Sequence, residues 1–91
     1  MVIKQPEPGR FFLNLLRRDE DWLVPYDGGS CEELIEDESG GDPFWIPRAC
    51  LVGVEEAVEV VSYFIRHVGP APGVRWSKWS QLPLPESYPY P

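Results

Sequence analysis

Proline and glycine interrupt this chain at short intervals and thereby limit the length of every element that it can form. Eleven prolines and eight glycines are spread over 91 residues. Proline lacks the N–H that a sheet ladder or a helix interior needs, and glycine favours turns. The hydrophobic content of 43% is still enough for a core. The sequence therefore predicts a single small α+β domain built from short elements.

Short apolar runs between the turns predict strands. The alternating apolar run at 11–16 is typical of a strand that is buried on both faces, and 22–26 is expected to pair with it as a hairpin. Residues 1–9 are expected to be a loose lead-in or at most an edge strand. Further strands are predicted at 31–37, 44–47 and 74–79. These elements predict an antiparallel sheet of four or five short strands.

The clearest periodicity lies between Val54 and Val68 and predicts an amphipathic helix packed across one face of the sheet. Glutamates in its first turns and Arg66 and His67 in its last turn suit the helix dipole, and Gly69 with Pro70 should end it. Trp76 and Phe64 are expected in the core. The apolar positions predicted to face the sheet are Val54, Ala57, Val58, Val61, Phe64, Ile65 and Val68.

Residues 81–91 contain four prolines and two tyrosines. This composition predicts an extended, mobile tail, similar to polyproline II, that follows a domain formed by residues 1–80.

A run of acidic residues between 19 and 42 contains no lysine or arginine. Apolar side chains interrupt it, so it is expected to form part of a folded surface and not a disordered tail. Uncompensated like charges repel one another, and a cationic partner would relieve that repulsion. The alternative is a solvated face that only maintains solubility. The ten carboxylates are Asp19, Glu20, Asp21, Asp27, Glu32, Glu33, Glu36, Asp37, Glu38 and Asp42.

The formal net charge of −7 argues against direct binding to nucleic acid or to an anionic membrane. No segment resembles a signal or membrane-spanning sequence, which predicts a cytoplasmic protein. Cys31 and Cys50 form no C-x-x-C pair. A disulfide is arithmetically allowed, but two buried free thiols are the preferred interpretation.

The residue pattern predicts neither an enzyme nor a metal or cofactor protein. His67 is the only histidine, and no nucleophile motif accompanies it. The spacing from Asp37 to Asp42 does not fit a calcium loop, and neither cysteine has a neighbouring ligand. We therefore predict no catalytic residue, no metal site and no cofactor.

Four tryptophans are more than a domain of this size can bury completely. Trp45 and Trp22 are the leading candidates for surface aromatic residues that anchor a partner, although Trp45 would equally fit beneath a loop.

Five short motifs follow one another along the chain, at 26–29, 40–41, 44–47, 54–64 and 73–76. In this order they resemble the Imm1 family of bacterial immunity proteins over about residues 20–79. That resemblance implies an inhibitor that is encoded beside a polymorphic toxin, often a nucleic-acid deaminase or nuclease, and that blocks the toxin by binding. The chain differs from the family in its short N-terminal part and its Pro/Tyr-rich tail.

We therefore predict an immunity protein whose acidic surface occupies a basic cleft on its toxin. The first alternative is a small adaptor that uses its tail or a sheet edge, and the second is a small enzyme or metal protein. The sequence leaves the toxin and the oligomeric state open. The predicted partner-binding residues are Asp19, Glu20, Asp21, Trp22, Asp27, Glu32, Glu33, Glu36, Asp37 and Trp45.

Overall fold

The computed structural model describes residues 1–16, 21–37 and 44–89. In this part of the chain one α-helix accompanies several short antiparallel strands, which confirms the α+β class. The elements are β1 (Val2–Glu7), β2 (Arg10–Asn14), β3 (Leu23–Pro25), β4 (Leu34–Asp37), β5 (Phe44–Pro47), the 3₁₀ turn η1 (Arg48–Cys50), α1 (Val54–His67), β6 (Trp76–Lys78) and the 3₁₀ turn η2 (Trp79–Gln81).

The strands pair as three two-stranded sheets, so the prediction of one continuous sheet is wrong for the described residues. β1 pairs with β2, β3 with β6, and β4 with β5, all antiparallel. The ladders of β3 and β5 end at Pro25 and Pro47, which cannot donate to a neighbouring strand. Proline therefore ends one strand in two of the three sheets.

The hairpin predicted between 11–16 and 22–26 is reduced to one bridge, between Leu15 and Leu23. Residues 2–7, expected to be at most an edge strand, take the place of the predicted partner and pair with β2 from Val2 to Glu7. The other edge of β2 carries the bridge to Leu23 and a second bridge from Phe11 to Val52. Strand β2 therefore lies at the centre of the molecule.

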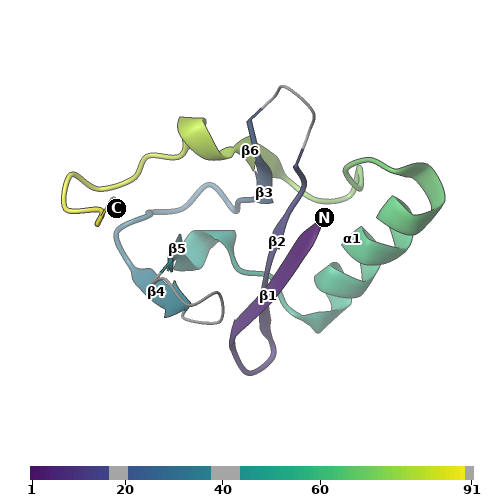
Figure 1. Ribbon diagram of the computed structural model, residues 1–91, viewed down its shortest axis with the longest axis horizontal. Coiled ribbons are helices and arrows are strands. Elements are labelled where there is room, and N and C mark those ends of the chain that lie inside the picture. The colour runs from purple at the N-terminus through teal and green to yellow at the C-terminus, as the bar shows by residue number, and fades with distance from the viewer. Residues whose placement is uncertain (17–20, 38–43, 90–91) are drawn as a thin grey trace.

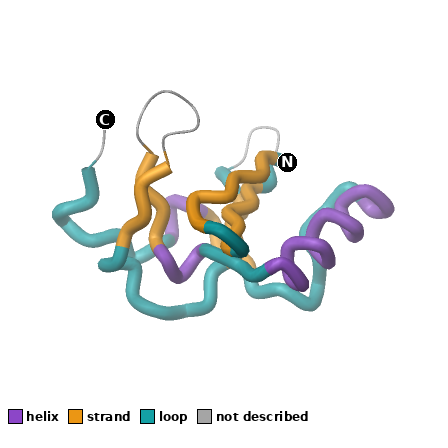
Figure 2. The backbone as a smooth tube through the Cα atoms, turned by 90° about the horizontal axis from the view of Figure 1, so that it is seen from below, coloured by secondary structure: helices purple, strands orange, loops and turns teal. Residues whose placement is uncertain are grey.

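The two faces of β2 point into two separate hydrophobic clusters, which confirms the prediction of a strand buried on both faces. Phe12 packs in the first cluster and Leu13 in the second, because successive side chains of a strand alternate between faces. Figures 1 and 2 show the β1–β2 hairpin between α1 on one side and β4–β5 on the other. The first cluster contains Phe12, Val24, Cys31, Ile46, Cys50 and Leu82, and the second contains Leu13, Val52, Ala57, Val60 and Ala71.

Helix α1 has almost the predicted bounds, but it is rotated relative to the predicted face. Ala57 and Val60 are its buried residues, and Tyr63 packs beside them. Val54, Val58, Ile65 and Val68, which we expected to face the sheet, are exposed. A two-stranded hairpin is narrower than the apolar arc of this helix, so it covers only part of that arc. Trp76 packs on this cluster as predicted, and its indole N–H donates to the Ala71 carbonyl at 2.9 Å.

The C-terminal segment that we expected to be an extended tail packs against the body as far as residue 88. Leu82 belongs to the first hydrophobic cluster, and Tyr88 is buried. The Tyr88 ring lies 6.2 Å from that of Trp79, measured between centroids. Within the described residues, no helix is both long and apolar enough to span a membrane.

Candidate functional site

Three exposed carboxylates of the acidic stretch gather around one hollow, which we call the acidic hollow. Its volume is about 370 Å³. It lies where the loop between β3 and β4 passes the 3₁₀ turn η1, so residues 27–33 face residues 48 and 49. The residues that line it are Asp27, Gly29, Ser30, Glu32, Glu33, Arg48 and Ala49.

Local hydrogen bonds fix the loop that forms this hollow. The Asp27 N–H donates to the Ala49 carbonyl at 3.1 Å, which fastens the loop to η1. The Asp27 carboxylate accepts the Gly29 N–H at 2.7 Å, and Ser30 Oγ accepts the Glu32 N–H at 3.2 Å. Gly28 has φ of 86°, in the left-handed region that favours glycine. The turn predicted at 27–30 is therefore confirmed, and it holds the carboxylates in place.

Arg48 is the only cation among the residues that line the hollow, and two carboxylates already bind it. Its guanidinium contacts both carboxylate oxygens of Glu7 at 2.8 and 2.9 Å, and its Nε donates to Glu33 at 2.7 Å. The Glu7 and Glu33 hydrogen bonds raise the pKa of Arg48 above its ordinary value, with Glu7 the larger cause. The side chains of Asp27 and Glu32 add further negative charge, so the hollow has an excess of carboxylates.

Two other predicted partner-binding residues, Asp21 and Asp37, contact other parts of the fold. The Asp21 carboxylate accepts the Ser80 N–H at 2.7 Å and the Trp22 N–H at 2.8 Å. These hydrogen bonds, with those to Ser80 as the largest cause, lower the pKa of Asp21. Asp37 is buried and forms an ion pair with Lys4 at 2.8 Å. Both carboxylates hold distant segments together.

The acidic stretch lacks basic residues in sequence, but tertiary contacts supply several of them. Lys4 reaches Asp37, Arg48 reaches Glu33, and Lys78 lies close enough to Asp21 to lower its pKa further. The premise that the whole stretch is uncompensated is therefore wrong. Asp19 and Glu20 lie outside the described residues.

The remaining predicted residues lie near the edge of this region or in the aromatic core. Glu36 on β4 is half-buried and stands opposite Trp45 of β5 in the strand register. Trp45 is also half-buried, and its carbonyl accepts the Tyr88 hydroxyl. Trp22 packs in an aromatic cluster, 5.9 Å from Trp79 and 6.1 Å from Phe44 between ring centroids. Both tryptophans are therefore half-buried, Trp22 within the aromatic cluster and Trp45 opposite a carboxylate of β4.

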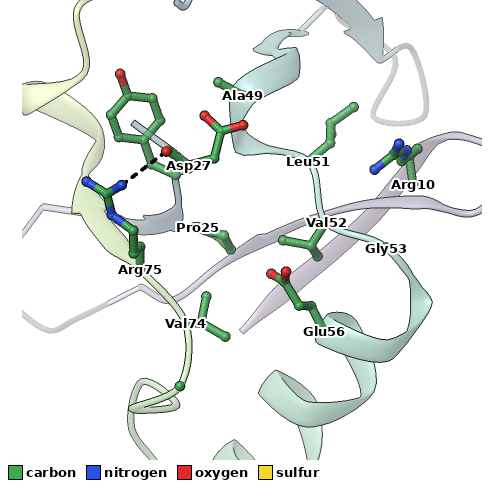
Figure 3. A pocket seen from close by; sticks show the side chains of 12 residues that line it. Arg10, Pro25, Asp27, Ala49, Leu51, Val52, Gly53, Glu56, Val74 and Arg75 are labelled. Atoms are coloured by element: carbon green, nitrogen blue, oxygen red, sulfur yellow. Dashed lines mark hydrogen bonds between the residues drawn. The ribbon is translucent and has the colours of Figure 1, made fainter. Parts of the chain in front are cut away.

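A second, larger cleft of about 410 Å³ was missed by the sequence reasoning. Figure 3 shows Arg75 beside Asp27 on one side of the cleft, with Arg10 and Glu56 on the other. Arg75 donates to the Asp27 carbonyl at 3.1 Å and lies over Gly28, where an added Cβ would come within 2.9 Å of its guanidinium. The four charged residues, Arg10, Asp27, Glu56 and Arg75, come from four separate segments. No sequence motif therefore predicts the cleft. Its charges are balanced in sign, and its lining includes no cysteine, histidine or serine.

The two cysteines and the histidine line neither the acidic hollow nor the second cleft. Cys31 and Cys50 are free and buried in the first hydrophobic cluster. Burial raises the pKa of Cys31 and raises that of Cys50 to about 12. His67 is exposed, and its ring lies 4.5 Å from that of Tyr63. Across residues 1–16, 21–37 and 44–89, no group of three or more His, Cys, Asp or Glu side chains is arranged to hold a metal ion.

Comparison of the chain with known protein families, curated proteins and solved structures finds no match. The resemblance to immunity proteins therefore rests on the sequence motifs alone.

Proposed function

We propose that this chain is a binding protein that recognises a basic partner through the acidic hollow, and that this partner is a bacterial toxin whose nucleic-acid cleft it blocks. The observation that carries the proposal is the gathering of Asp27, Glu32 and Glu33 around one hollow whose single arginine is already paired. Lysine or arginine side chains of a partner would meet carboxylates that accept charge-assisted hydrogen bonds.

The inhibitory mechanism follows from charge mimicry. A nucleic-acid enzyme binds phosphates with lysine and arginine, and carboxylates presented in a fixed loop can take the place of those phosphates. The Asp27–Gly29 and Ser30–Glu32 hydrogen bonds hold the loop before binding, which reduces the entropy lost in the complex. Inhibition then requires only occupation of the cleft and no chemical step.

The proposed contact surface is smaller than the set predicted from sequence. Asp27, Glu32 and Glu33 form its centre, and Glu36 with Trp45 extends it along β4–β5. A half-buried tryptophan opposite a half-buried carboxylate has the composition of an interface anchor. Asp21, Asp37 and Trp22 contribute through the fold, and Asp19 and Glu20 stay candidates on their sequence position alone.

A pair of charge reversals tests the proposal against purified bacterial toxin domains of the nucleic-acid deaminase and nuclease classes. Glu32→Lys with Glu33→Lys should weaken binding at least about a hundredfold at low salt, since opposite charges become like charges. The matched control is Glu56→Lys with Glu59→Lys on α1, two exposed positions where the same change in net charge should alter affinity less than about threefold. Isothermal titration calorimetry and toxin inhibition are the measurements. Equal losses in both variants would refute a role for the hollow.

The alternative function, an adaptor that recruits a partner through its C-terminal segment, needs its own variant. Truncation at residue 80 is unsuitable, because it would also remove Leu82 and Tyr88 from the packed interior. Pro83→Ala with Pro89→Ala changes two exposed positions of that segment and leaves the buried residues in place. Unchanged toxin binding in this variant supports the acidic hollow, whereas loss of partner capture would support the adaptor.

A further inference from the structure

Helix α1 exposes a continuous apolar seam that the monomer does not cover. Val54, Val58, Ile65 and Val68 are 54%, 59%, 74% and 76% exposed, and Val61 lies between them. Their spacing alternates between four and three residues, which places them in one stripe along the helix. Buried residues Ala57 and Val60 occupy a different side of the helix, so the seam is additional to the face that packs on the hairpin.

The β1–β2 hairpin extends this seam into a shallow apolar groove of about 270 Å³. Ile3, which is 51% exposed, forms its far wall, and Phe11 and Leu13 form its floor. Apolar surface of this extent along a whole helix is typical of a protein interface. The groove is lined by Ile3, Phe11, Leu13, Val54, Ala57, Val58, Val61 and Ser62.

The end of the helix is strained in a way that packing within the monomer does not explain. Val68 adopts φ of 51° and ψ of 49° at the C-cap, although Gly69 follows immediately. A β-branched residue in the left-handed region is a genuine outlier. The Val68 N–H donates to the Phe64 carbonyl at 2.8 Å and so caps the helix, but its largely exposed side chain gains little from packing within the described chain.

The charges beside the seam favour a second copy of this chain as its occupant. Glu55 and Arg66 are eleven residues apart, close to three turns at about 3.6 residues per turn, so they lie on the same side of the helix. In a parallel pair of helices, Glu55 of one copy and Arg66 of the other lie at opposite ends of the pair, so they cannot form an ion pair. In an antiparallel pair, each Glu55 lies beside Arg66 of the other copy, which gives two favourable ion pairs.

The apolar residues of the seam also fit an antiparallel two-fold arrangement. A two-fold axis through Val61 brings Val54 opposite Val68 of the other copy and places Val58 beside Ile65. A two-fold interface requires such self-complementarity, because one surface serves both partners. We propose that α1 mediates an antiparallel homodimer through this seam, with Ile3 at its border. The β3–β4 loop and η1, which form the acidic hollow, lie on the opposite side of the β1–β2 hairpin from α1 (Figure 1), so a dimer leaves both hollows free.

Sedimentation velocity of the full chain tests the dimer across concentrations from about 10 µM to about 1 mM, because small interfaces associate weakly. The wild type should shift from monomer to dimer, and Val58→Asp with Ile65→Asp should stay monomeric. Leu16→Asp, an exposed apolar position away from α1, is the matched control and should dimerise as the wild type does. Circular dichroism checks that each variant is folded. A wild type that stays monomeric throughout, or a seam variant that still dimerises, would overturn the proposal.

A charge swap distinguishes antiparallel pairing from non-specific hydrophobic association. Glu55→Arg alone and Arg66→Glu alone should each weaken dimerisation about tenfold, because each places like charges across the two-fold axis. The double variant with both changes should recover the dimer. Single variants that match the wild type, or a double variant that is no better than the singles, would contradict antiparallel pairing. Neither result depends on toxin binding, so this test and that of the proposed function can fail separately.

Discussion

The hydroxyl of Tyr88 donates a hydrogen bond to the carbonyl oxygen of Trp45 at 2.6 Å, and this contact joins the C-terminal segment to strand β5 across 43 residues of sequence. Tyr88 is buried, and its ring also contacts Trp79. The proline-rich segment that follows η2 is therefore anchored at its far end as well as at Leu82. Leu82 and Tyr88, which were expected to lie outside the folded unit, therefore help to stabilise it.

Substitution of Tyr88 should measure that anchor. Tyr88→Phe removes the hydroxyl that binds Trp45 and should lower the free energy of unfolding by about 1 kcal/mol. Tyr88→Ala also leaves a cavity and should cost about 3–5 kcal/mol. Ser87→Ala, at an exposed neighbouring position, is the control. Urea denaturation gives the values, and a Tyr88→Ala variant as stable as the wild type would show that the segment does not contribute.

The ion pair between Lys4 and Asp37 should stabilise the packing of β1 beside β4. The Asp37 side chain is 6% exposed, so removal of its cationic partner leaves a carboxylate in a poorly solvated place. Lys4→Met should therefore lower the free energy of unfolding by about 1–3 kcal/mol. Lys78→Met, at an exposed strand position, should change it by less than about 0.5 kcal/mol. Chemical denaturation of both variants checks this, and similar losses would contradict the assignment.

The hydrogen bonds of Asp21 predict an acid-sensitive contribution to stability. Its pKa is lowered in the folded state from an ordinary value of 3.8, so the folded protein binds the proton less readily than the unfolded chain. The contribution is present above about pH 4 and is lost as the pH falls through the lowered folded pKa. Asp21→Asn should therefore be less stable than the wild type at pH 7, and the gap should narrow toward pH 2. Thermal denaturation across this range measures the gap, and a constant gap would exclude this linkage.

The two cysteines should be inert in the folded protein. Burial raises the pKa of the Cys50 thiol to about 12 and also raises that of Cys31, so little thiolate is present at pH 8. A disulfide-exchange reagent such as Ellman's reagent should therefore react slowly with the native protein and rapidly with both thiols in denaturant. Fast native labelling of either cysteine would mean that the first hydrophobic cluster opens readily. Mass spectrometry would identify the labelled residue.

The left-handed conformation of Val68 predicts a stabilising substitution. Val68→Gly relieves the steric cost of φ at 51° and should raise the stability of the monomer by about 1 kcal/mol. Val68→Ala keeps a Cβ and should give a smaller gain. Denaturation at a protein concentration too low for self-association measures the stability of the monomer alone. A change in dimerisation through the seam then does not contribute to the result. A Val68→Gly variant that is less stable than the wild type would show that the helix end does not carry this strain.

Local chemistry made several elements predictable. The helix begins at Val54, where the apolar periodicity starts, and ends shortly before the Gly69–Pro70 pair, and β5 ends at Pro47 as expected. The turn at Gly28 needed only the left-handed conformation that glycine permits. Strand pairing was less predictable, because β2 is compatible with either β1 or β3 by its apolar pattern. The structure selects β1, and reduces the contact with β3 to one bridge.

The candidate site was likewise predictable from the sequence only in part. The sequence revealed the dense carboxylates, but it could not show that Lys4, 33 residues from Asp37, or Arg48, 41 residues from Glu7, would pair with acidic side chains. It also could not separate Asp21, which binds backbone N–H groups of Trp22 and Ser80, from the acidic residues that line the hollow.

The sequence by itself determined the α+β class, the position of the helix and the excess of negative charge, because these follow from local periodicity, turn residues and composition. Tertiary structure decided which strands pair, which side of α1 is buried and which carboxylates stay available. Those outcomes depend on contacts between residues far apart in sequence. A narrow two-stranded hairpin beneath a helix with a wide apolar arc leaves part of that arc exposed, and the acidic hollow forms only where the 27–33 loop meets η1.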